Sequence, residues 1–252
     1  MEPKRDNSPG KFSKLRREPQ SQNLFPLFVH ETDLLSKLKG LGYDPAVIYD
    51  IGASNGIWSD TIALVLPDSE YHLFEPLADV VEFYRHDLAE RSQRRPRFHL
   101  HPVALGDHSG TAEFFVTQDG FGSSMLDRGD ISEVTQRIGV RTAKLDEYIA
   151  EHGLPLPNLI KIDCQGAERM ILDGGCNALE QADMVFLETW FDRDYGPQTP
   201  LLGEMIEYLK QRAFTLVETG EKLYGDRGRL YSVDAFFFSD KFSQRFVLPQ
   251  DR

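Results

Sequence analysis

The residues best suited to hold a ligand lie in the stretch VIYDIGASNG, residues 47–56. An apolar run ends there in an acid, and two glycines then enclose three small or polar residues. The six positions are Asp50, Gly52, Ala53, Ser54, Asn55 and Gly56. Glycines let the backbone approach a ligand closely, and a helix that begins after them presents free N–H groups. A plain strand-to-helix turn accounts for the same glycines equally well.

Two common phosphate-binding motifs do not fit this turn. The dinucleotide motif G-x-G-x-x-G needs glycine where this chain has Ser54 and Ile57, and the branched side chain of Ile57 would block a pyrophosphate. A P-loop needs Gly-Lys-Ser or Gly-Lys-Thr, and neither follows the turn. The pattern therefore disfavours a nicotinamide-dependent oxidoreductase, which stays open as a weaker alternative.

Glu75 supplies a second signal, about 20 residues beyond the turn and at the end of the next apolar run, EYHLFEP. A carboxylate at this place can accept hydrogen bonds from both ribose hydroxyls of an adenosine. An acid before Pro76 could instead stabilise the start of a helix, but we favour ribose binding. An adenosine ligand without a pyrophosphate site indicates S-adenosylmethionine.

The elements that must position these residues alternate along the chain. We expect buried strands at 46–52, 70–76, 97–107, 159–166 and 182–191, with helices within 30–45, after Gly56, and at 77–93, 167–175 and 201–213. Thr32 is the expected cap of the first helix, and Gly42 with Pro45 should end it. Residues 111–117 and 140–145 are predicted as a separate excursion of β-structure, and residues 214–218 and 233–239 as a hairpin. Repeated β-then-α units predict an α/β fold with a doubly wound, mostly parallel sheet and a C-terminal antiparallel hairpin. Ligands bind such sheets at the carboxyl ends of the strands.

Composition limits the classes of function. The chain has 252 residues, 40% of them hydrophobic, and a net charge of −12, which disfavours nucleic acid as a partner. No apolar run is long enough to insert in a membrane, and an apolar secretory signal is lacking, so we expect a cytoplasmic protein. Residues 1–23 are basic and polar and are predicted to form a disordered tail, with a binding arm as the alternative. Residues 24–252 are predicted to form one domain.

Several motifs in one order make the chain resemble the FkbM family of S-adenosylmethionine-dependent methyltransferases, from about residue 38 to residue 238. The motifs are YDIGASNGIWS, FEP, VALGD, SSML, LDEYI, KIDCQGAERMIL and VDAFFF. The resemblance implies a seven-stranded Rossmann-like fold and methyltransferase activity for the domain at 24–252. Many relatives have a second acid where this chain has Gln165, which cannot act as a general base.

The resemblance also implies a place for each part of the cofactor, S-adenosyl-L-methionine. Asp50 and residues 52–56 would surround its methionine end, Glu75 with Pro76 would hold the ribose, and Ala104 and Leu105, together with Gly106, would border the adenine. Asp163 would face the methionyl amine or the acceptor.

Methyl transfer from a sulfonium needs alignment in a water-poor pocket, and a hydroxyl acceptor must also lose a proton. Candidate bases at the expected strand ends are Asp163, Glu168, Glu188, His101 and His108. Asp163 is the first choice and Glu188 the second, although Asp163 could serve only to position the cofactor and Glu188 could be a satisfied buried acid. For Glu168, a contact at a helix start is favoured over catalysis. We expect no metal, since the three acids come from different strands and lack a ligand spacing.

The methyl acceptor is expected to be a hydroxyl group on a small molecule or sugar, covered by the loop QDGFGSSML at residues 118–126. A rival from another class is a non-catalytic protein of the same fold that binds a partner through its final Phe-rich strand, residues 236–238. The sequence does not indicate the oligomeric state.

Overall fold

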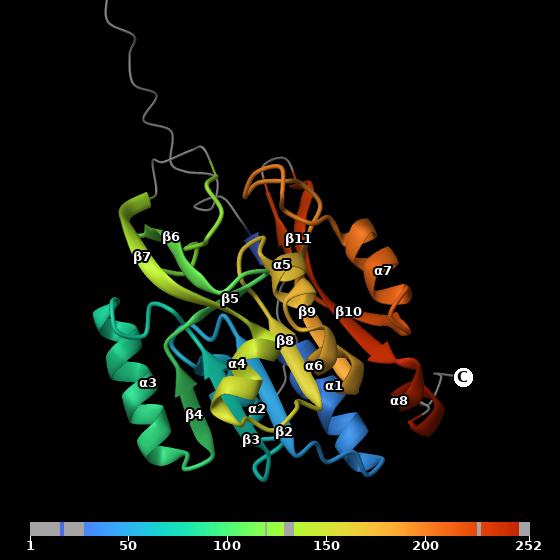
Figure 1. Ribbon diagram of the computed structural model, residues 1–252. Helices are drawn as coiled ribbons and strands as arrows, with labels where there is room; N and C mark the ends of the chain where they lie inside the picture. Colours follow the sequence, from blue (N-terminus) through green and yellow to red (C-terminus); the bar gives the residue numbers. More distant parts are fainter. Residues whose placement is uncertain (1–15, 18–27, 119, 129–133, 226–227, 247–252) are drawn as a thin grey trace, which may run out of the picture.

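The computed structural model describes residues 16–17, 28–118, 120–128, 134–225 and 228–246. The main sheet has the strand order β1-β10-β11-β9-β8-β2-β3-β4 (Figure 1). The bounds are β1 (Arg16–Arg17), β2 (Val47–Ile51), β3 (Glu70–Phe74), β4 (Phe98–His101), β8 (Leu159–Ile162), β9 (Met184–Trp190), β10 (Phe214–Tyr224) and β11 (Leu230–Ser239).

The predicted fold class is confirmed. Strands β4, β3, β2, β8 and β9 pair in parallel, and β11 pairs antiparallel with both β9 and β10. These seven strands are joined at one edge by the two-residue strand β1, which pairs with Leu223 and Tyr224 of β10. The rest of the predicted tail, residues 1–15 and 18–23, lies outside the described residues.

A smaller sheet lies beyond the carboxyl ends of the parallel strands (Figure 1). It consists of β5 (Ala104–Gly106), β6 (Gly110–Thr117) and β7 (Val134–Lys144), with β7 in the centre. The β-excursion predicted from the sequence is therefore present. The single strand predicted at 97–107 is wrong, because it divides at Pro102 into β4 of the main sheet and β5 of the smaller one.

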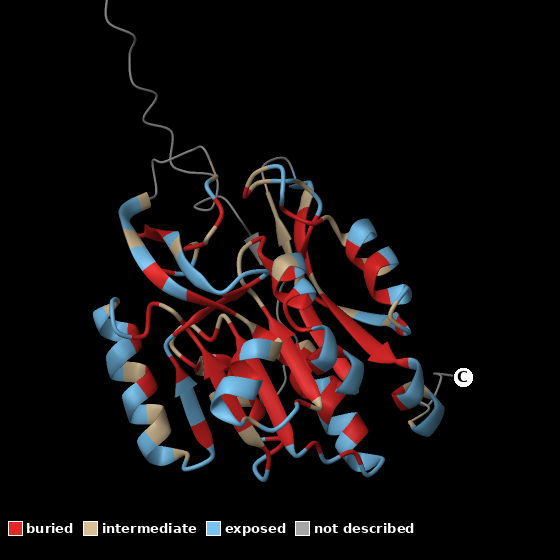
Figure 2. Cartoon of the chain, viewed as in Figure 1, coloured by how far each residue is buried: buried red, intermediate tan, exposed pale blue. Residues whose placement is uncertain are grey.

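Helices cover both faces of the main sheet. The buried apolar residues form two large clusters, one on each face of the sheet. One cluster contains residues of α1, α2, α3 and α8, and the other contains residues of α4, α5, α6 and α7. The bounds are α1 (Val29–Gly40), α2 (Ile57–Ile62), α3 (Glu82–Arg94), α4 (Leu145–His152), α5 (Glu168–Asp173), α6 (Cys176–Gln181), α7 (Leu202–Lys210) and α8 (Asp240–Arg245). Every residue of β2 and β8 is buried as a result (Figure 2). This explains why central strands read as continuous apolar runs.

The start of α1 differs from the expected cap at Thr32. The helix begins at Val29 after Phe28, which has a left-handed φ of 52°, and the Thr32 hydroxyl donates to the carbonyl oxygen of Phe28 at 3.0 Å. Thr32 therefore stabilises the first turn from within the helix. The end of α1 is as expected, since Gly42 follows with a φ of 93°.

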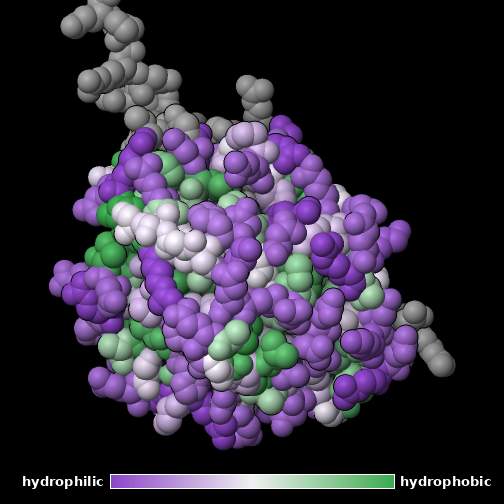
Figure 3. All heavy atoms as spheres, in the orientation of Figure 1, coloured by the Kyte–Doolittle hydropathy of each residue, from purple (hydrophilic) through white to green (hydrophobic). Residues whose placement is uncertain are grey.

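The surface in Figure 3 is largely hydrophilic, and its hydrophobic residues form separate groups. Among the described helices, none combines the length and the apolar character that crossing a bilayer requires. The final Phe-rich strand lies inside the sheet, and Phe236, Phe237 and Phe238 are almost fully buried. These phenylalanines therefore stabilise the core and are not exposed for contact with a partner.

Candidate active site

A cavity of about 680 Å³ lies between the carboxyl ends of the main-sheet strands and the smaller sheet. Its lining includes many of the residues proposed from the sequence: Gly52, Ser54, Glu75, Pro76, Ala104, Leu105, Asp163 and Glu188. The volume is that of a typical small-molecule site. The strand order thus places residues that are distant in sequence around one cavity.

The turn after β2 is held tightly against the two neighbouring strands. The N–H groups of Gly52 and Ala53 both donate to the carbonyl oxygen of Phe74, at 3.0 and 3.1 Å. Gly52 has a φ of 74°, and a Cβ atom on it would lie 2.0 Å from the carbonyl oxygen of Asp163. The backbone directly after β8 therefore passes too close for any side chain at Gly52.

Ser54 continues this turn in a left-handed conformation, with a φ of 52°. Its N–H donates to the Glu75 carboxylate at 2.8 Å. Its hydroxyl oxygen is buried and has no hydrogen-bond partner within the described part of the chain. A hydroxyl left in this way at a cavity wall is available to a bound ligand.

Glu75 is fixed by backbone groups on both sides. Its Oε2 accepts from the N–H of Ser54 at 2.8 Å, and its Oε1 accepts from the N–H of Leu77 at 2.9 Å. Each oxygen keeps a second lone pair for a hydroxyl donor. Burial raises the pKa of Glu75 to about 7 although these two hydrogen bonds favour the carboxylate.

The opposite wall holds two carboxyl groups that one amide connects. The amide nitrogen of Gln165 donates to Asp163 at 2.9 Å and to Glu188 at 3.0 Å, and its amide oxygen accepts from the Tyr195 hydroxyl. A neutral amide at this position supplies two donors where a third acid would add repulsion. Burial, with the charges of Asp163 and Asp234, raises the pKa of Glu188 well above its ordinary value.

The loop at residues 118–126 lies at the cavity, as expected for a cover. Gln118, Gly120, Phe121, Gly122, Ser123 and Met125 line it, while residue 119 lies outside the description. The Ser124 hydroxyl donates to the carbonyl oxygen of Gln165 at 2.9 Å and accepts from the N–H of Leu126 at 3.0 Å. The loop is thereby fastened to the wall that holds the two acids.

Comparison with known proteins identifies the family. Residues 50–216 match the methyltransferase FkbM domain. The chain belongs to the FkbM methyltransferase family. The match begins at Asp50 and includes the turn after β2, Glu75, Asp163 and Glu188, so it covers every residue of the cavity lining except Leu223.

Two curated proteins resemble this FkbM domain. A 2-O-methyltransferase, NoeI, from Sinorhizobium fredii is 28% identical over an alignment of 171 residues, and the match covers 63% of this chain and 68% of NoeI. A hexuronic acid methyltransferase, AglP, from Haloferax volcanii is 25% identical over 176 residues, which are 69% of this chain and 68% of AglP. Among solved structures, the FkbM methyltransferase from Methylobacillus flagellatus is 15% identical, with a TM-score of 0.49. That match covers 77% of this chain and 43% of the other chain.

Asp50 of this FkbM domain lies beneath the cavity. It is fully buried, with one oxygen 3.0 Å from the Lys161 ammonium and the other accepting from the Ser59 hydroxyl at 2.7 Å. Lys161 also donates to the carbonyl oxygen of Gly52 at 2.8 Å. Burial alone would lower the pKa of Lys161, but the carboxylates of Asp50 and Asp163 outweigh it and raise the pKa above its ordinary value. Asp50 and Lys161 therefore support the turn from below.

Sequence reasoning missed Lys161. A signal was available, because a lysine inside the apolar run LIKI is almost always paired when it is buried. In the described part of the chain, the cavity lining also lacks three further residues of the turn after β2: Ala53, Asn55 and Gly56. Their proposed contact with the cofactor stays a prediction.

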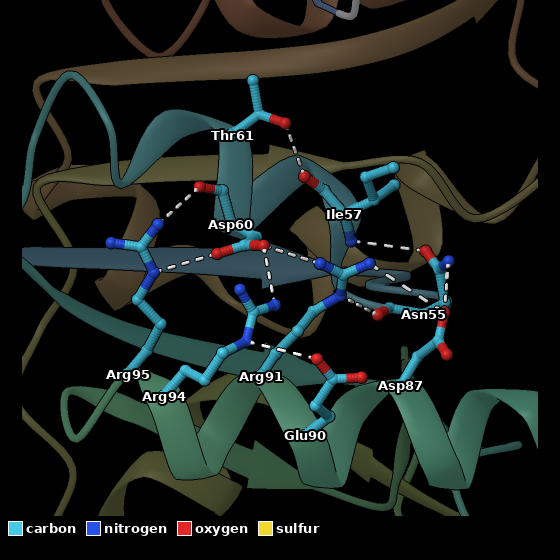
Figure 4. A network of polar contacts seen from close by, with 9 residues as sticks. All are labelled: Asn55, Ile57, Asp60, Thr61, Asp87, Glu90, Arg91, Arg94 and Arg95. Carbon is cyan, nitrogen blue, oxygen red and sulfur yellow. Dashed lines mark hydrogen bonds and ion pairs between the residues drawn. The ribbon is translucent and has the colours of Figure 1, made fainter.

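A polar network holds α3 against the turn (Figure 4). Asp60 of α2 accepts from Arg91 at 2.6 Å, from Arg95 at 2.9 Å and from Arg94 at 3.3 Å, and Arg91 also donates to the carbonyl oxygen of Asn55 at 2.9 Å. Burial would raise the pKa of Asp60, but the three guanidinium groups outweigh it and lower the pKa. Asn55 in turn donates to Asp87 of α3 at 3.0 Å. This network fixes the backbone that follows Ser54.

Three of the candidate bases lie outside the cavity lining. Glu168 is fully buried, and its Oε1 accepts from the N–H groups of Cys164 and Gly166, each at 3.1 Å. His101 is buried beside His72 and Tyr148, and His108 is exposed and bonded to Asp107. None of the three belongs to the cavity lining found in the described residues.

The buried acids predict that the protein loses stability as the pH rises. Burial raises the pKa of Glu31, Glu75 and Glu168 from 4.5 to about 7, so the folded protein holds protons that the unfolded chain has released. Their stabilising protonation is lost as the pH passes through 7, at up to about 1.4 kcal/mol per pH unit for each proton. Burial lowers the pKa of His72 and His101 from 6.5 to about 4, and this opposing effect acts below pH 6.5.

Urea unfolding of the ligand-free protein should therefore give a lower free energy of unfolding at pH 8 than at pH 6.5. Glu168→Gln removes one of the titrating groups and should make the difference smaller. Equal stability at both pH values would contradict the prediction.

Proposed function

We propose that this protein transfers a methyl group from S-adenosylmethionine to a hydroxyl oxygen of a small molecule or sugar, in the cytoplasm. The observation that carries the proposal is the position of Glu75. Both of its oxygens are fixed by backbone N–H groups, and it faces a cavity whose other wall holds Asp163 and Glu188. A ribose anchor and a polar acceptor side therefore share one cavity.

The residues present fit this cofactor. Glu75 has lone pairs for two ribose hydroxyls, and Val103, Ala104 and Leu105 form an apolar wall for a planar base. The buried Ser54 hydroxyl is available to a polar group of the methionine part. The bare backbone at Gly52 leaves room for close approach.

S-adenosylmethionine supplies an electrophilic methyl group on a positively charged sulfur. In the transfer, the acceptor oxygen forms a bond to this methyl group as the carbon–sulfur bond breaks, and the hydroxyl proton must leave. Asp163, which is partly exposed, is proposed to take the proton, while Gln165 holds its other oxygen in place. Glu188 is proposed to remain protonated, because its raised pKa disfavours the charge, and to bind the acceptor.

The similarity to NoeI and AglP, whose names indicate 2-O-methylation and methylation of a hexuronic acid, supports a sugar or glycan acceptor. The lining supports it independently, because Thr117 of β6 and Gln118 and Ser123 of the loop add polar groups to those of Asp163, Gln165 and Glu188. Sugars carry many hydroxyl groups and need such a lining to replace their hydration.

The experiment is calorimetric titration with S-adenosylmethionine, S-adenosylhomocysteine and NAD, followed by transfer of a labelled methyl group to monosaccharides and oligosaccharides. We expect both sulfur compounds to bind, NAD not to bind, and label to appear in a sugar. Absence of binding by both sulfur compounds would contradict the cofactor assignment. Binding without transfer to any hydroxyl acceptor would favour the non-catalytic alternative.

Glu75→Gln should weaken binding of S-adenosylmethionine by about 10- to 100-fold, because hydrogen bonds to a charged group contribute about 1.5–3 kcal/mol. Asp79→Asn is a matched control, since Asp79 is an exposed acid in the same loop. Thermal melting of both variants verifies folding. Equal affinity in Glu75→Gln and Asp79→Asn would show that Glu75 does not bind the ribose.

A further inference from the structure

Three metal-binding side chains gather on one face of β3 and β4, at the opposite end of β3 from the cavity. They are Glu70, His72 and His99, and their ligand atoms lie within 4.8 Å of one another. Glu70 and His72 lie two residues apart on β3 and therefore share one face of the strand. His99 of β4 is the register partner of His72 in the parallel pair. Two neighbouring strands thus bring together a carboxylate and two imidazoles, whose rings are stacked with centroids 4.9 Å apart.

One ring nitrogen of His72 is buried without a hydrogen-bond partner among the described residues. The His72 side chain is only 4% exposed, and its Nε2 has no hydrogen-bond partner among the residues that the structure describes. A buried polar atom without a partner is costly, and a ligand at this point would satisfy it. This observation is independent of the spacing of the three side chains.

The other nitrogen of His72 determines what kind of ligand fits. His72 Nδ1 lies 3.0 Å from His101 Nε2, and His101 Nδ1 lies 3.2 Å from the Tyr148 hydroxyl. If His72 Nδ1 carries the proton and donates to His101, then His72 Nε2 has a lone pair free for a ligand. In the reverse arrangement, Nε2 would be a buried donor without an acceptor among the described residues. A metal ion favours the first arrangement, in which a partner behind the ligand fixes its tautomer.

We propose that Glu70, His72 and His99 bind a divalent transition-metal ion of the zinc type. Two imidazoles and one carboxylate are typical zinc ligands, and three protein ligands leave a fourth position for water. Metal–ligand distances near 2.1 Å require the ligand atoms to move together by about 1 Å. The exposed His99 and the partly exposed Glu70 can make this movement while His72 remains fixed.

The position of the cluster assigns the ion a structural role. Glu70 begins β3 and Phe74, which lines the cavity, ends it, so the two residues are separated by about 13 Å at about 3.3 Å per residue. β4 has four residues and is the edge strand of the main sheet, where pairing is on one side. An ion between β3 and β4 would hold this short strand in place.

The test is titration of the chelator-treated full chain with Zn²⁺ in the absence of other ligands, together with thermal melting and the visible absorption of bound Co²⁺. We expect Zn²⁺ to raise the melting temperature and Co²⁺ to give the absorption of a tetrahedral site. His99→Ala should weaken Zn²⁺ binding by more than about tenfold and abolish this absorption. Because His99 is exposed, the variant is expected to fold.

His86→Ala is the matched control, since His86 lies on α3 with 77% of its side chain exposed and is outside the cluster. It should bind Zn²⁺ as the unchanged protein does. Glu70→Gln should weaken binding without removing an imidazole. The proposal is overturned if Zn²⁺ does not stabilise the unchanged protein, or if His99→Ala and His86→Ala bind it equally well.

Discussion

Gly52→Ala should abolish binding of S-adenosylmethionine and lower the free energy of unfolding by about 2–5 kcal/mol. The left-handed φ of 74° costs a residue with a Cβ atom about 1–2 kcal/mol. The new methyl group would also lie 2.0 Å from the carbonyl oxygen of Asp163, a backbone atom that moves only with β8, and such overpacking costs about 1–3 kcal/mol. Moving the turn away would separate Ser54 from Glu75, so affinity and stability fall together.

Gly153→Ala is the control that measures the conformational cost of a left-handed φ without the steric clash. Gly153 has a φ of 61° after α4, and no described atom lies within 4 Å of an added Cβ. This variant should lose only the conformational cost of about 1–2 kcal/mol and should keep full cofactor affinity. Urea unfolding and calorimetry measure both quantities. If Gly52→Ala is no less stable than Gly153→Ala and still binds the cofactor, the close approach of β8 has no functional consequence.

The main sheet could be predicted because its strands are short apolar runs that end in turn residues. Buried parallel strands need apolar side chains on both faces, and this produces the runs in β2, β8 and β9. The division at Pro102 was not foreseen, since Phe98–His101 and Ala104–Gly106 read as one run. Proline cannot donate to a ladder, and the chain leaves the main sheet there.

The cavity could be predicted in part for a related reason. Parallel strands bring their carboxyl ends to one edge, so Gly52, Glu75 and Asp163 had to lie near one another once the sheet was recognised. The direction of each side chain within a turn is decided by contacts across the fold. The Asp50 side chain forms an ion pair with Lys161, and the Asn55 side chain donates a hydrogen bond to Asp87. No pattern along the chain indicates either partner.

The cluster at Glu70, His72 and His99 shows the same limit. The spacing of the first two residues fits one face of a strand, but His99 comes from the neighbouring strand. Whether His72 and His99 face each other depends on the register of β3 against β4. A slip by one residue would place His99 on the opposite face of the sheet.

Lys161→Met should lower the free energy of unfolding by about 3–5 kcal/mol, because removing one partner of a buried ion pair leaves the other charge uncompensated. Asp50 is fully buried, and after the substitution its carboxylate would keep the Ser59 hydroxyl as a partner. The carbonyl oxygen of Gly52 would also lose its donor. Since this carbonyl belongs to the turn after β2, which we propose to contact the cofactor, affinity for S-adenosylmethionine should fall as well. Urea unfolding at neutral pH measures the first effect and calorimetry the second.

Asp50→Asn combined with Lys161→Met separates the lost charge pair from the lost packing. The double variant buries no uncompensated charge, so it should be more stable than Lys161→Met alone, and the two effects should not add. If the double variant is no more stable than Lys161→Met, Lys161 supports the turn through packing and its hydrogen bond to Gly52, and the charge pair with Asp50 contributes little.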